Sequence, residues 1–272
     1  MRLDLHVHST ASDGAVAPAE VVRLAAQGGL DVIAISDHDS VAGVPEAREE
    51  ARSYSIQIVP ALEVSSTSSE REIHILGYFI DPEAESITAH QERAVSVRNN
   101  RMLEMVGRLN SAGLAVTMDD VLEFTSGPRT MIGRPHLAKA LVKRGHVATV
   151  PAAFERFIGD GMDAHVPTRL VDPAEAIQLI EDAGGIAVWA HPPQDLLQDL
   201  LPGLVNAGLK GLEIYRPKAR ADQILVLERA AKEAGLMVSG GSDWHSPESG
   251  TALGKFYVTA DEVAGLLEAG GI

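Results

Sequence analysis

The first residues of the chain place an acid and two histidines at alternate positions. Within residues 2–8, Asp4, His6 and His8 are separated by aliphatic side chains, and this alternation is typical of a β-strand with one polar face. Two imidazoles on one face of a strand are spaced by roughly 6.6 Å, and both rings can reach one metal ion at about 2.0–2.1 Å. A face turned to solvent would explain one histidine, but it explains three ionisable groups in a row poorly. The pattern therefore favours a metal site.

The same residue types recur at the ends of the other predicted strands. His38 follows the second predicted strand, Glu63 ends the next, and His191 ends a later one. In a barrel of parallel strands these ends meet at one mouth, where active sites are built. His74 lies near the start of its strand, so it fits only if that strand runs antiparallel to the one before it. The candidate ligands are His6, His8, Asp13, His38, Glu63, His74, His191, Asp243 and His245.

Nine nitrogen and oxygen donors are too many for one tetrahedral ion and suit two or three ions. A carboxylate can bridge two ions, and Glu63 is the residue that we expect in this role. The other ionisable residues are expected to have simpler roles: ligand orientation or helix capping for Asp4, Asp37 and Asp39, and a solvated surface for His90, His146 and His165.

The composition narrows the chemistry further. The chain has 272 residues, 45% of them hydrophobic, which suits one α/β barrel or two small domains. Ten histidines and no cysteine exclude a thiolate zinc site, an iron–sulfur cluster and a cysteine nucleophile. A formal net charge of −15 argues against a general nucleic-acid coat, so we expect no stable DNA binding. Because no long apolar segment or secretory signal is visible, we expect no membrane association and a cytoplasmic location.

Short aliphatic segments alternate with helical ones, which predicts βα units and a mainly parallel sheet. Helices are marked by a proline at the start and glycines at the end, as in the segments that begin at Pro18 and Pro173. The predicted strands are residues 2–8, 31–36, 57–64, 72–79, 186–191, 210–215 and 236–241.

This alternation stops between residues 98 and 170, where only helical patterns are found. The segment has a formal net charge of +3, whereas the other 199 residues carry −18. An insertion of helices into a βα scaffold explains both features, although longer helices of the scaffold itself remain an alternative. We therefore predict an α/β fold in three parts: a first barrel part at 1–97, a helical insertion that covers the substrate at 98–170, and a second barrel part at 171–272.

Together these segments resemble the PHP family, named for polymerase and histidinol phosphatase domains. The matching motifs are His6-Val7-His8-Ser9 with Asp13, Ser36-Asp37-His38-Asp39, Glu63 with His74, His191-Pro192 and Asp243-Trp244-His245. The resemblance implies a distorted (β/α)7 barrel that holds two to three divalent metal ions, Mn²⁺ first, with Fe²⁺ or Zn²⁺ as alternatives. It assigns His6, His8, Glu63 and Asp243 to one ion, Glu63, His74 and His191 to a second, and Asp13, His38 and His245 to a third. Asp13 stands where some relatives have histidine, which slightly favours a harder metal.

The helical segment and Gly133-Arg134-Pro135-His136 further resemble the bacterial 3′,5′-nucleoside bisphosphate phosphatases and the related 5′-3′ exoribonucleases. The resemblance implies a phosphoric monoester hydrolase that removes the 3′-phosphate of a small nucleotide substrate, with a metal-bound hydroxide as nucleophile. Arg134, His136 and Arg216 are the candidate substrate-binding residues, because arginine and helix N-termini both favour phosphate. The tetrapeptide equally suits the start of an ordinary helix.

Other functions stay open at this point. A 5′-3′ exoribonuclease acting on short RNA and a histidinol-phosphate-type phosphatase would use the same ligands. A metal-dependent amidohydrolase also begins with His-x-His, but it typically adds a strand lysine that bridges its metals and a lone aspartate on its final strand. A PHP-like interaction scaffold without activity would be expected to lose ligands, whereas all nine positions here hold a suitable residue.

Overall fold

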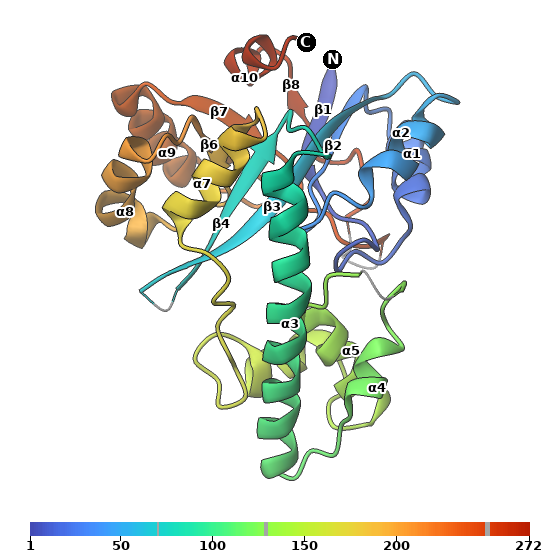
Figure 1. The fold of residues 1–272 in the computed structure, drawn as a ribbon. Coiled ribbons are helices and arrows are strands. Elements are labelled where there is room, and N and C mark those ends of the chain that lie inside the picture. Colours follow the sequence, from blue (N-terminus) through green and yellow to red (C-terminus); the bar gives the residue numbers. More distant parts are fainter. Residues whose placement is uncertain (70, 128–129, 248–250) are drawn as a thin grey trace.

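The fold is an α/β barrel of eight strands, seen in a computed structural model that describes residues 1–69, 71–127, 130–247 and 251–272 (Figure 1). The strands are hydrogen-bonded in the order β7-β6-β5-β4-β3-β2-β1-β8. Their bounds are β1 Arg2–Val7, β2 Val32–Ile35, β3 Gln57–Ser68, β4 Arg71–Tyr78, β5 Ile186–Trp189, β6 Gly211–Tyr215, β7 Met237–Gly240 and β8 Val258–Thr259.

The sheet is mixed because one central strand is reversed. Strands β1, β2 and β3 run parallel to one another, and so do β5, β6 and β7. Strand β4 runs antiparallel to both of its neighbours, β3 and β5. The start of β4, which carries His74, therefore lies at the same end of the barrel as the C-terminal ends of the parallel strands. This is the orientation that the position of His74 required.

The seven predicted strands are all present, and the short β8 is an additional one. It pairs antiparallel with the start of β1, through Arg2 opposite Thr259. At the other end of β1, the backbone nitrogen of His8 donates to the carbonyl of Trp244, in the segment after β7, at 2.9 Å. Through these two contacts, β1 is joined to β8 and to the segment after β7, so the barrel is nearly closed.

The pairing of β1 with β2 shifts in register between Asp4 and Val7. Leu3 and Leu5 pack in an apolar cluster of strand residues inside the barrel, whereas Val7 packs in the cluster beneath the surrounding helices. The strict alternation predicted for residues 2–8 is therefore wrong, because an extra residue is accommodated in the strand. A bulge of this kind re-aims side chains beside an active site.

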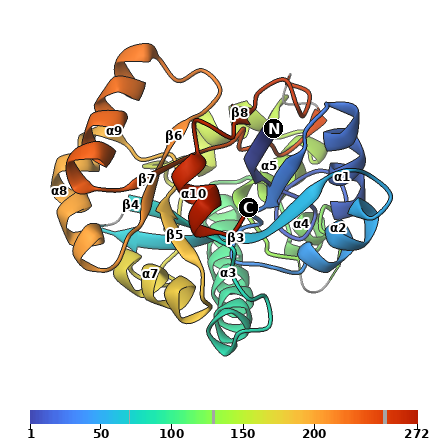
Figure 2. The same ribbon diagram turned by 90° about the horizontal axis from the view of Figure 1, so that it is seen from above.

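Helices cover the outside of the barrel and close one of its ends. The surrounding helices are α1 Pro18–Gln27, α2 Val44–Ala51, α7 Pro173–Asp182, α8 Gln194–Asn206 and α9 Ala221–Ala234. Helix α10, Ala264–Ala269, lies across one end, where its Leu266 and Leu267 join the interior cluster (Figure 2). The opposite end is the mouth at which the candidate ligands gather.

A helical lobe extends beyond this mouth (Figure 1). It consists of the second half of α3 Glu85–Ser111, with α4 Met118–Leu122, α5 Arg134–Lys143, α6 Val150–Ala153 and the π-helix η1 Phe154–Ile158. The lobe has an apolar cluster of its own, in which Met105, Leu109 and Leu137 are fully buried. Helix α3 runs without interruption through residues 97 and 98, from the barrel wall into the lobe.

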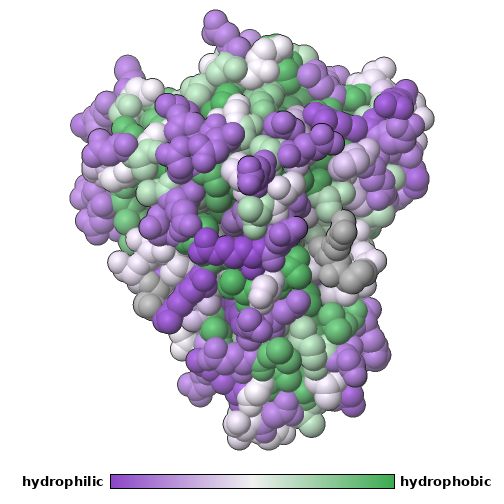
Figure 3. Space-filling model, viewed as in Figure 1, coloured by the Kyte–Doolittle hydropathy of each residue, from purple (hydrophilic) through white to green (hydrophobic). Residues whose placement is uncertain are grey.

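The surface of the molecule is mainly hydrophilic on the face shown in Figure 3, with scattered apolar patches over both the barrel and the lobe. Among the described residues, no helix is both long and apolar enough to cross a membrane.

Candidate metal centre

The structure brings all nine candidate ligands to the mouth that faces the helical lobe. They lie in or directly after strands, except for Asp13, which belongs to the loop between β1 and α1. We call these residues the Glu63 cluster; its members are His6, His8, Asp13, His38, Glu63, His74, His191, Asp243 and His245.

The carboxylate of Glu63 lies at the centre of the cluster and is fully buried. Its Oε1 atom lies 3.0 Å from Nδ1 of His74 and 2.9 Å from Nε2 of His191. Its Oε2 atom lies 3.4 Å from Nε2 of His6, 3.5 Å from Nε2 of His8 and 3.0 Å from Nδ1 of His38. The two oxygens thus face two different sets of imidazoles, which is the arrangement that a bridging carboxylate needs.

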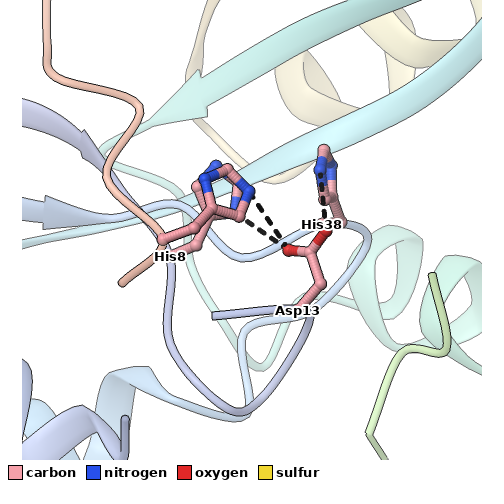
Figure 4. Close-up of side chains that lie close together, drawn as sticks. His8, Asp13 and His38 are labelled. Atoms are coloured by element: carbon pink, nitrogen blue, oxygen red, sulfur yellow. Dashed lines mark ion pairs between the residues drawn. The ribbon is translucent and has the colours of Figure 1, made fainter. Parts of the chain in front are cut away.

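Asp13 lies between two of these rings, as Figure 4 shows. Its carboxylate oxygens are 3.9 Å from Nδ1 of His8 and 3.9 Å from Nε2 of His38. The third neighbour is His245, whose Nε2 is 3.3 Å from Asp13 Oδ1. The loop that carries Asp13 passes so close to β1 that a Cβ atom on Gly14 would lie 2.7 Å from the carbonyl of His8. Glycine is therefore required at position 14 to bring Asp13 to the cluster.

Asp243 approaches the cluster from the segment after β7. Its Oδ1 lies 3.5 Å from Nε2 of His6 and 3.2 Å from Nε2 of His8, and 41% of its side chain is exposed. The backbone of this segment passes close to β1, since a Cβ atom on Gly241 would lie 2.4 Å from the backbone nitrogen of His6. The backbone of Asp243 has a positive φ of 53°, a conformation that is uncommon for residues other than glycine and recurs at functional sites.

The cluster fits divalent metal ions by two observations. In each of three groups of residues, the potential ligand atoms all lie within 4.8 Å of one another. The groups are His8, Asp13, His38 and His245; His6, His8 and Asp243; and His38, Glu63 and His74. Two ligand atoms that each lie about 2.0–2.2 Å from one ion are at most roughly 4.4 Å apart, so a spacing of 4.8 Å would have to close by only about 0.4 Å when an ion binds. In addition, Nε2 of His6, both ring nitrogens of His8 and Oε2 of Glu63 are buried without a hydrogen-bond partner in the described part of the chain. Buried polar atoms are rarely left in this state.

The charges in the cluster also suit metal binding. Burial, and then repulsion from His245, lowers the pKa of His8 to about 3, so this imidazole is neutral at physiological pH. Burial would raise the pKa of Glu63, but the surrounding His38, His74 and His6 outweigh it and hold the pKa well below its usual value. Burial would lower the pKa of His6, His74 and His245, but the neighbouring carboxylates outweigh it and raise these pKa values. Metal ions would displace these protons, because neutral imidazoles and ionised carboxylates are the forms that bind metal ions.

Glu213 on β6 supports two members of the cluster and was missed by the sequence analysis. It is fully buried, and its Oε1 lies 2.8 Å from Nδ1 of His6. Its Oε2 accepts a hydrogen bond from the backbone nitrogen of His191 at 2.7 Å. A carboxylate on the second ring nitrogen of a metal-ligating histidine fixes the orientation of that ring. The available signal was a single acid within the short apolar strand Gly211–Tyr215.

The aspartates that flank the ligands hold their loops, as expected. Asp37 accepts hydrogen bonds from the backbone and hydroxyl of Ser9 and from the hydroxyl of Ser12, each at 2.7 Å, and so fixes the loop that carries Asp13. Asp4 accepts from the backbone nitrogen of Ser242 at 2.7 Å, directly before Asp243.

One expectation for the remaining histidines is wrong. His90 is not on a solvated surface: it is buried, and its Nε2 lies 2.9 Å from Oδ1 of Asp39. The reason is that α3 begins at Glu85 and packs this part of its length against the barrel. His146 and His165 are partly exposed.

The candidate substrate-binding residues differ in their surroundings. Arg134, the first residue of α5, pairs with Asp160 at 2.6 Å and with Glu72 at 3.1 Å. His136 is buried, and its Nδ1 accepts a hydrogen bond from the backbone nitrogen of Gly133. Arg216 follows β6, between the strands that lead to His191 and Asp243. Among the described residues its guanidinium has no hydrogen bond or ion pair, and its Nε is buried.

Arg134 belongs to a second group of charged residues, which we call the Glu72 cluster: Glu72, Arg101, Arg134 and Thr168. Glu72 lies on β4, two residues before His74 and on the same face of the strand. It accepts hydrogen bonds from Arg101 at 2.9 Å, from Arg134 at 3.1 Å, and from the hydroxyl and backbone nitrogen of Thr168 at 2.8 and 3.2 Å. These contacts join the lobe and the segment after it to the wall of the barrel.

Known proteins share both the sequence pattern and the fold. The family model for the PHP domain matches residues 4–182. A 5′-3′ exoribonuclease of Haemophilus influenzae is 35% identical over 267 residues, which cover 96% of this chain and 96% of that protein. A 3′,5′-nucleoside bisphosphate phosphatase of Chromobacterium violaceum is 32% identical over 253 residues, 91% of this chain and 88% of that protein. The crystal structure of a proposed metal-dependent phosphoesterase from Bifidobacterium adolescentis superposes with a TM-score of 0.90 at 33% identity, covering 98% of this chain and 96% of the other.

Proposed function

The chain belongs to the PHP domain family, and from this premise we propose that it is a metal-dependent phosphatase of small nucleotides, with the 3′-phosphate of a nucleoside 3′,5′-bisphosphate as its preferred target. The observation that carries the proposal is the Glu63 carboxylate, whose two oxygens face five imidazoles, with three groups of ligand atoms around it. This arrangement suits hydrolysis of a phosphate ester more than amide chemistry, because several ions can share the charge of one phosphate.

The ligand assignment is the one that the family resemblance implies, and the short distances within the cluster support it. We assign His6, His8, Glu63 and Asp243 to one ion, Glu63, His74 and His191 to a second, and Asp13, His38 and His245 to a third. His8 and His38 each turn one ring nitrogen toward Glu63 and the other toward Asp13. Both rings therefore lie between the ligands around Glu63 and the ligands around Asp13. Divalent ions held by these residues, Mn²⁺ by preference, would polarise a bound phosphate ester and lower the pKa of bound water towards neutrality.

Arg216 is assigned to the phosphate that is cleaved. It lies at the mouth, directly after β6, between the strand ends that lead to His191 and Asp243. Its guanidinium makes no hydrogen bond or ion pair within the described residues, so it can bind a phosphate without first breaking a contact. Arginine presents several donors in a plane, which matches the oxygens of a phosphate.

Arg134 is assigned to the second phosphate, the one that is not cleaved. The start of α5 lies beside the metal site, since a Cβ atom on Gly133 would be 3.5 Å from Oδ2 of Asp13. A helix N-terminus with an arginine at its first residue favours an anion at this place. His136 holds this terminus through Nδ1, which leaves Nε2 as its only donor toward a substrate.

A second candidate function is 5′-3′ exoribonuclease activity on short RNA. It is favoured by the relative from Haemophilus influenzae, which bears this name, and by the positive net charge of residues 98–170. The same ligands would serve, but the lobe would then bind the sugar–phosphate backbone of the next nucleotides in place of one phosphate.

A panel of substrates separates these functions. We expect phosphate release from a nucleoside 3′,5′-bisphosphate with a higher kcat/KM than for a short 5′-phosphorylated RNA, histidinol phosphate or a cyclic amide. Preferred release of mononucleotides from the RNA would establish the exoribonuclease function. Hydrolysis of the cyclic amide alone would identify an amidohydrolase, and no turnover at all would leave an interaction scaffold.

The metal content is measured on the same preparation. Protein purified without chelators should contain two to three divalent metal ions per chain by elemental analysis, and chelation should abolish turnover until Mn²⁺ is restored. A reproducible content of one ion or fewer in fully active protein would contradict the assignment of three groups of ligands.

A further inference from the structure

Asp39, which directly follows the candidate ligand His38, is fully buried and held in a strained backbone conformation with φ 51°. Its backbone nitrogen donates to the carbonyl of Glu63 at 2.9 Å. Its carboxylate is surrounded by donors: Oδ1 accepts from the backbone of Ser65 at 2.8 Å and lies 2.9 Å from His90. Asp39 is thus fixed between two strands that carry ligands by its contacts to Glu63, Ser65 and His90, which do not involve the lobe.

The main partner of Asp39 is Arg98 on α3, which is also buried. Its Nε and Nη2 donate to Oδ2 of Asp39 at 2.8 and 2.5 Å, and Nη2 also donates to the hydroxyl of Ser65 at 2.7 Å. Ser65 is the cross-strand partner of His74. The remaining nitrogen, Nη1, donates to the carbonyl of Ile132 at 3.2 Å.

Ile132 connects this network to the lobe. It lies two residues before Arg134, in the segment that leads into α5. Among the described residues, the same segment is attached to the loop that carries Asp13 by two further hydrogen bonds, from the backbone of Met131 to the carbonyl of Ala11 and from the hydroxyl of Thr130 to the carbonyl of Thr10. One guanidinium therefore contacts the loop after His38, the strand after Glu63 and the approach to Arg134.

We propose that Arg98 is a positioning residue that sets the distance between the metal centre and the start of α5, and thereby the preference for substrates with two phosphates. Both sites are held from the same planar group, so a phosphate at the metals and a phosphate at Arg134 are kept at one separation. A lysine in this position keeps the charge, but its single nitrogen cannot take the place of the three guanidinium nitrogens that reach Asp39, Ser65 and Ile132. The inference rests on the proposed function, since the second phosphate is bound at Arg134.

The test compares Arg98→Lys with wild type on a nucleoside 3′,5′-bisphosphate and on the corresponding nucleoside 3′-monophosphate. We expect the kcat/KM for the bisphosphate to fall roughly 10- to 50-fold, mainly through KM, because a misplaced charge-assisted contact loses most of its strength. The kcat/KM for the monophosphate should fall by less than about 3-fold, because the substitution leaves the metal centre undisturbed. Metal content should stay at the wild-type value. Lysine is chosen because alanine would leave Asp39 as a buried unpaired charge and endanger folding.

His90→Gln is the matched control, because His90 lies on the same helix and contacts the same carboxylate but not Ile132. It should leave the ratio of the two kcat/KM values unchanged. Equal losses on both substrates in Arg98→Lys, a loss of metal, or an unchanged ratio would each overturn the inference. If wild-type protein does not hydrolyse the bisphosphate, the proposed function fails before any variant is compared, so the two failures are distinguishable.

Discussion

The Glu63 cluster and the Glu72 cluster occupy the same face of the β3–β4 pair, and both place carboxylates against cationic or imidazole side chains. They differ in how their polar atoms are used. In the Glu63 cluster, Oε2 of Glu63 and ring nitrogens of His6 and His8 are buried without a hydrogen bond in the described residues. In the Glu72 cluster, the carboxylate accepts four hydrogen bonds, from Arg101, Arg134 and Thr168.

This difference separates a site whose polar atoms lack partners from one whose carboxylate already has all its partners. A buried polar atom without a partner costs free energy, so a whole group of them indicates that a ligand supplies the missing contacts. Glu72 needs no such ligand: burial would raise its pKa, but Arg101 and Arg134 outweigh burial and lower the pKa to about 2. Substitutions in the first cluster should therefore abolish metal binding, whereas substitutions in the second should shift affinity for substrate by modest amounts.

The largest effect is expected for Glu63→Gln. The amide keeps the size of the side chain but has no negative charge, so it cannot bridge two metal ions as the carboxylate would. Metal content and turnover should therefore fall together. We expect turnover to fall roughly 100- to 1,000-fold, the range for removing one partner from a buried charge network. The measurement is elemental analysis and kcat on the same preparation.

The matched control is Glu72→Gln, the same substitution on the neighbouring strand, which should leave metal content unchanged. If Glu63→Gln retained its metal and its turnover, the bridging role would be wrong. Equal loss of metal in both variants would mean that the two clusters do not differ in the way that their hydrogen bonding indicates. The equivalent change at Asp243, whose side chain is 41% exposed, should have a smaller effect.

The next largest effect is expected for Glu213→Gln. Glu213 contacts Nδ1 of His6 and the backbone of His191, and partners of this kind typically contribute 10- to 100-fold to metal affinity. We expect a fall of about that size in Mn²⁺ affinity, measured by titration of metal-free protein. Glu228→Gln is the control, because Glu228 accepts a hydrogen bond from Tyr215 on the same strand but lies on a helix outside the barrel. Unchanged affinity in Glu213→Gln would show that His6 is oriented by other contacts.

The comparison also explains what the sequence could predict. Candidate ligands follow strands at short range, so the ends of six predicted strands point to all members of the Glu63 cluster except Asp13, which lies in a loop and was singled out by the family resemblance. The reversed strand of His74 needed an added assumption. Contacts between distant segments leave no local pattern. The pairs of Arg134 with Glu72 and Asp160, and of Arg98 with Asp39, join residues separated by 26 to 62 positions.

Three further features escaped prediction for related reasons. The bulge in β1 depends on the pairing of β1 with β2, so a perfect alternation in residues 2–8 looked like an undistorted strand. His90 was expected on a solvated surface, as an isolated histidine usually is, and only the packing of α3 on the barrel buries it beside Asp39. Glu213 was passed over because an acid in a short strand has no distinguishing spacing.

Arg134→Ala should have a moderate and selective effect. Because Glu72 and Asp160 already pair with Arg134, binding a phosphate exchanges contacts, and the net loss on removal should be near the lower limit for a charge-assisted hydrogen bond, about 10-fold in kcat/KM. The loss should be larger for a nucleoside 3′,5′-bisphosphate than for a 3′-monophosphate, with metal content unchanged. Arg144→Ala, which removes another lobe arginine paired with Asp120, controls for the net charge. Equal losses on both substrates would place Arg134 on the cleaved phosphate or in a purely structural role.

The smallest effect, and the one of opposite sign, is expected for Asp160→Asn. Asp160 is 78% exposed, and its Oδ1 lies 2.6 Å from Nη1 of Arg134, so it competes with a phosphate for that nitrogen. Glu72 keeps the guanidinium in place when Asp160 is neutralised. Because exposed ion pairs contribute little, KM for the bisphosphate should fall by only about 2- to 5-fold, and less at high salt.

The control for this gain is Asp163→Asn, which removes the same charge three residues further along the chain. If the gain comes from freeing Arg134, Asp163→Asn should leave KM unchanged, and Asp160→Asn should have no effect in an Arg134→Ala background. Equal gains in both variants would mean that the net charge of the lobe, and not the pairing of Asp160 with Arg134, determines KM. A rise in KM for Asp160→Asn would mean that Asp160 orients Arg134 for the phosphate and does not compete with it.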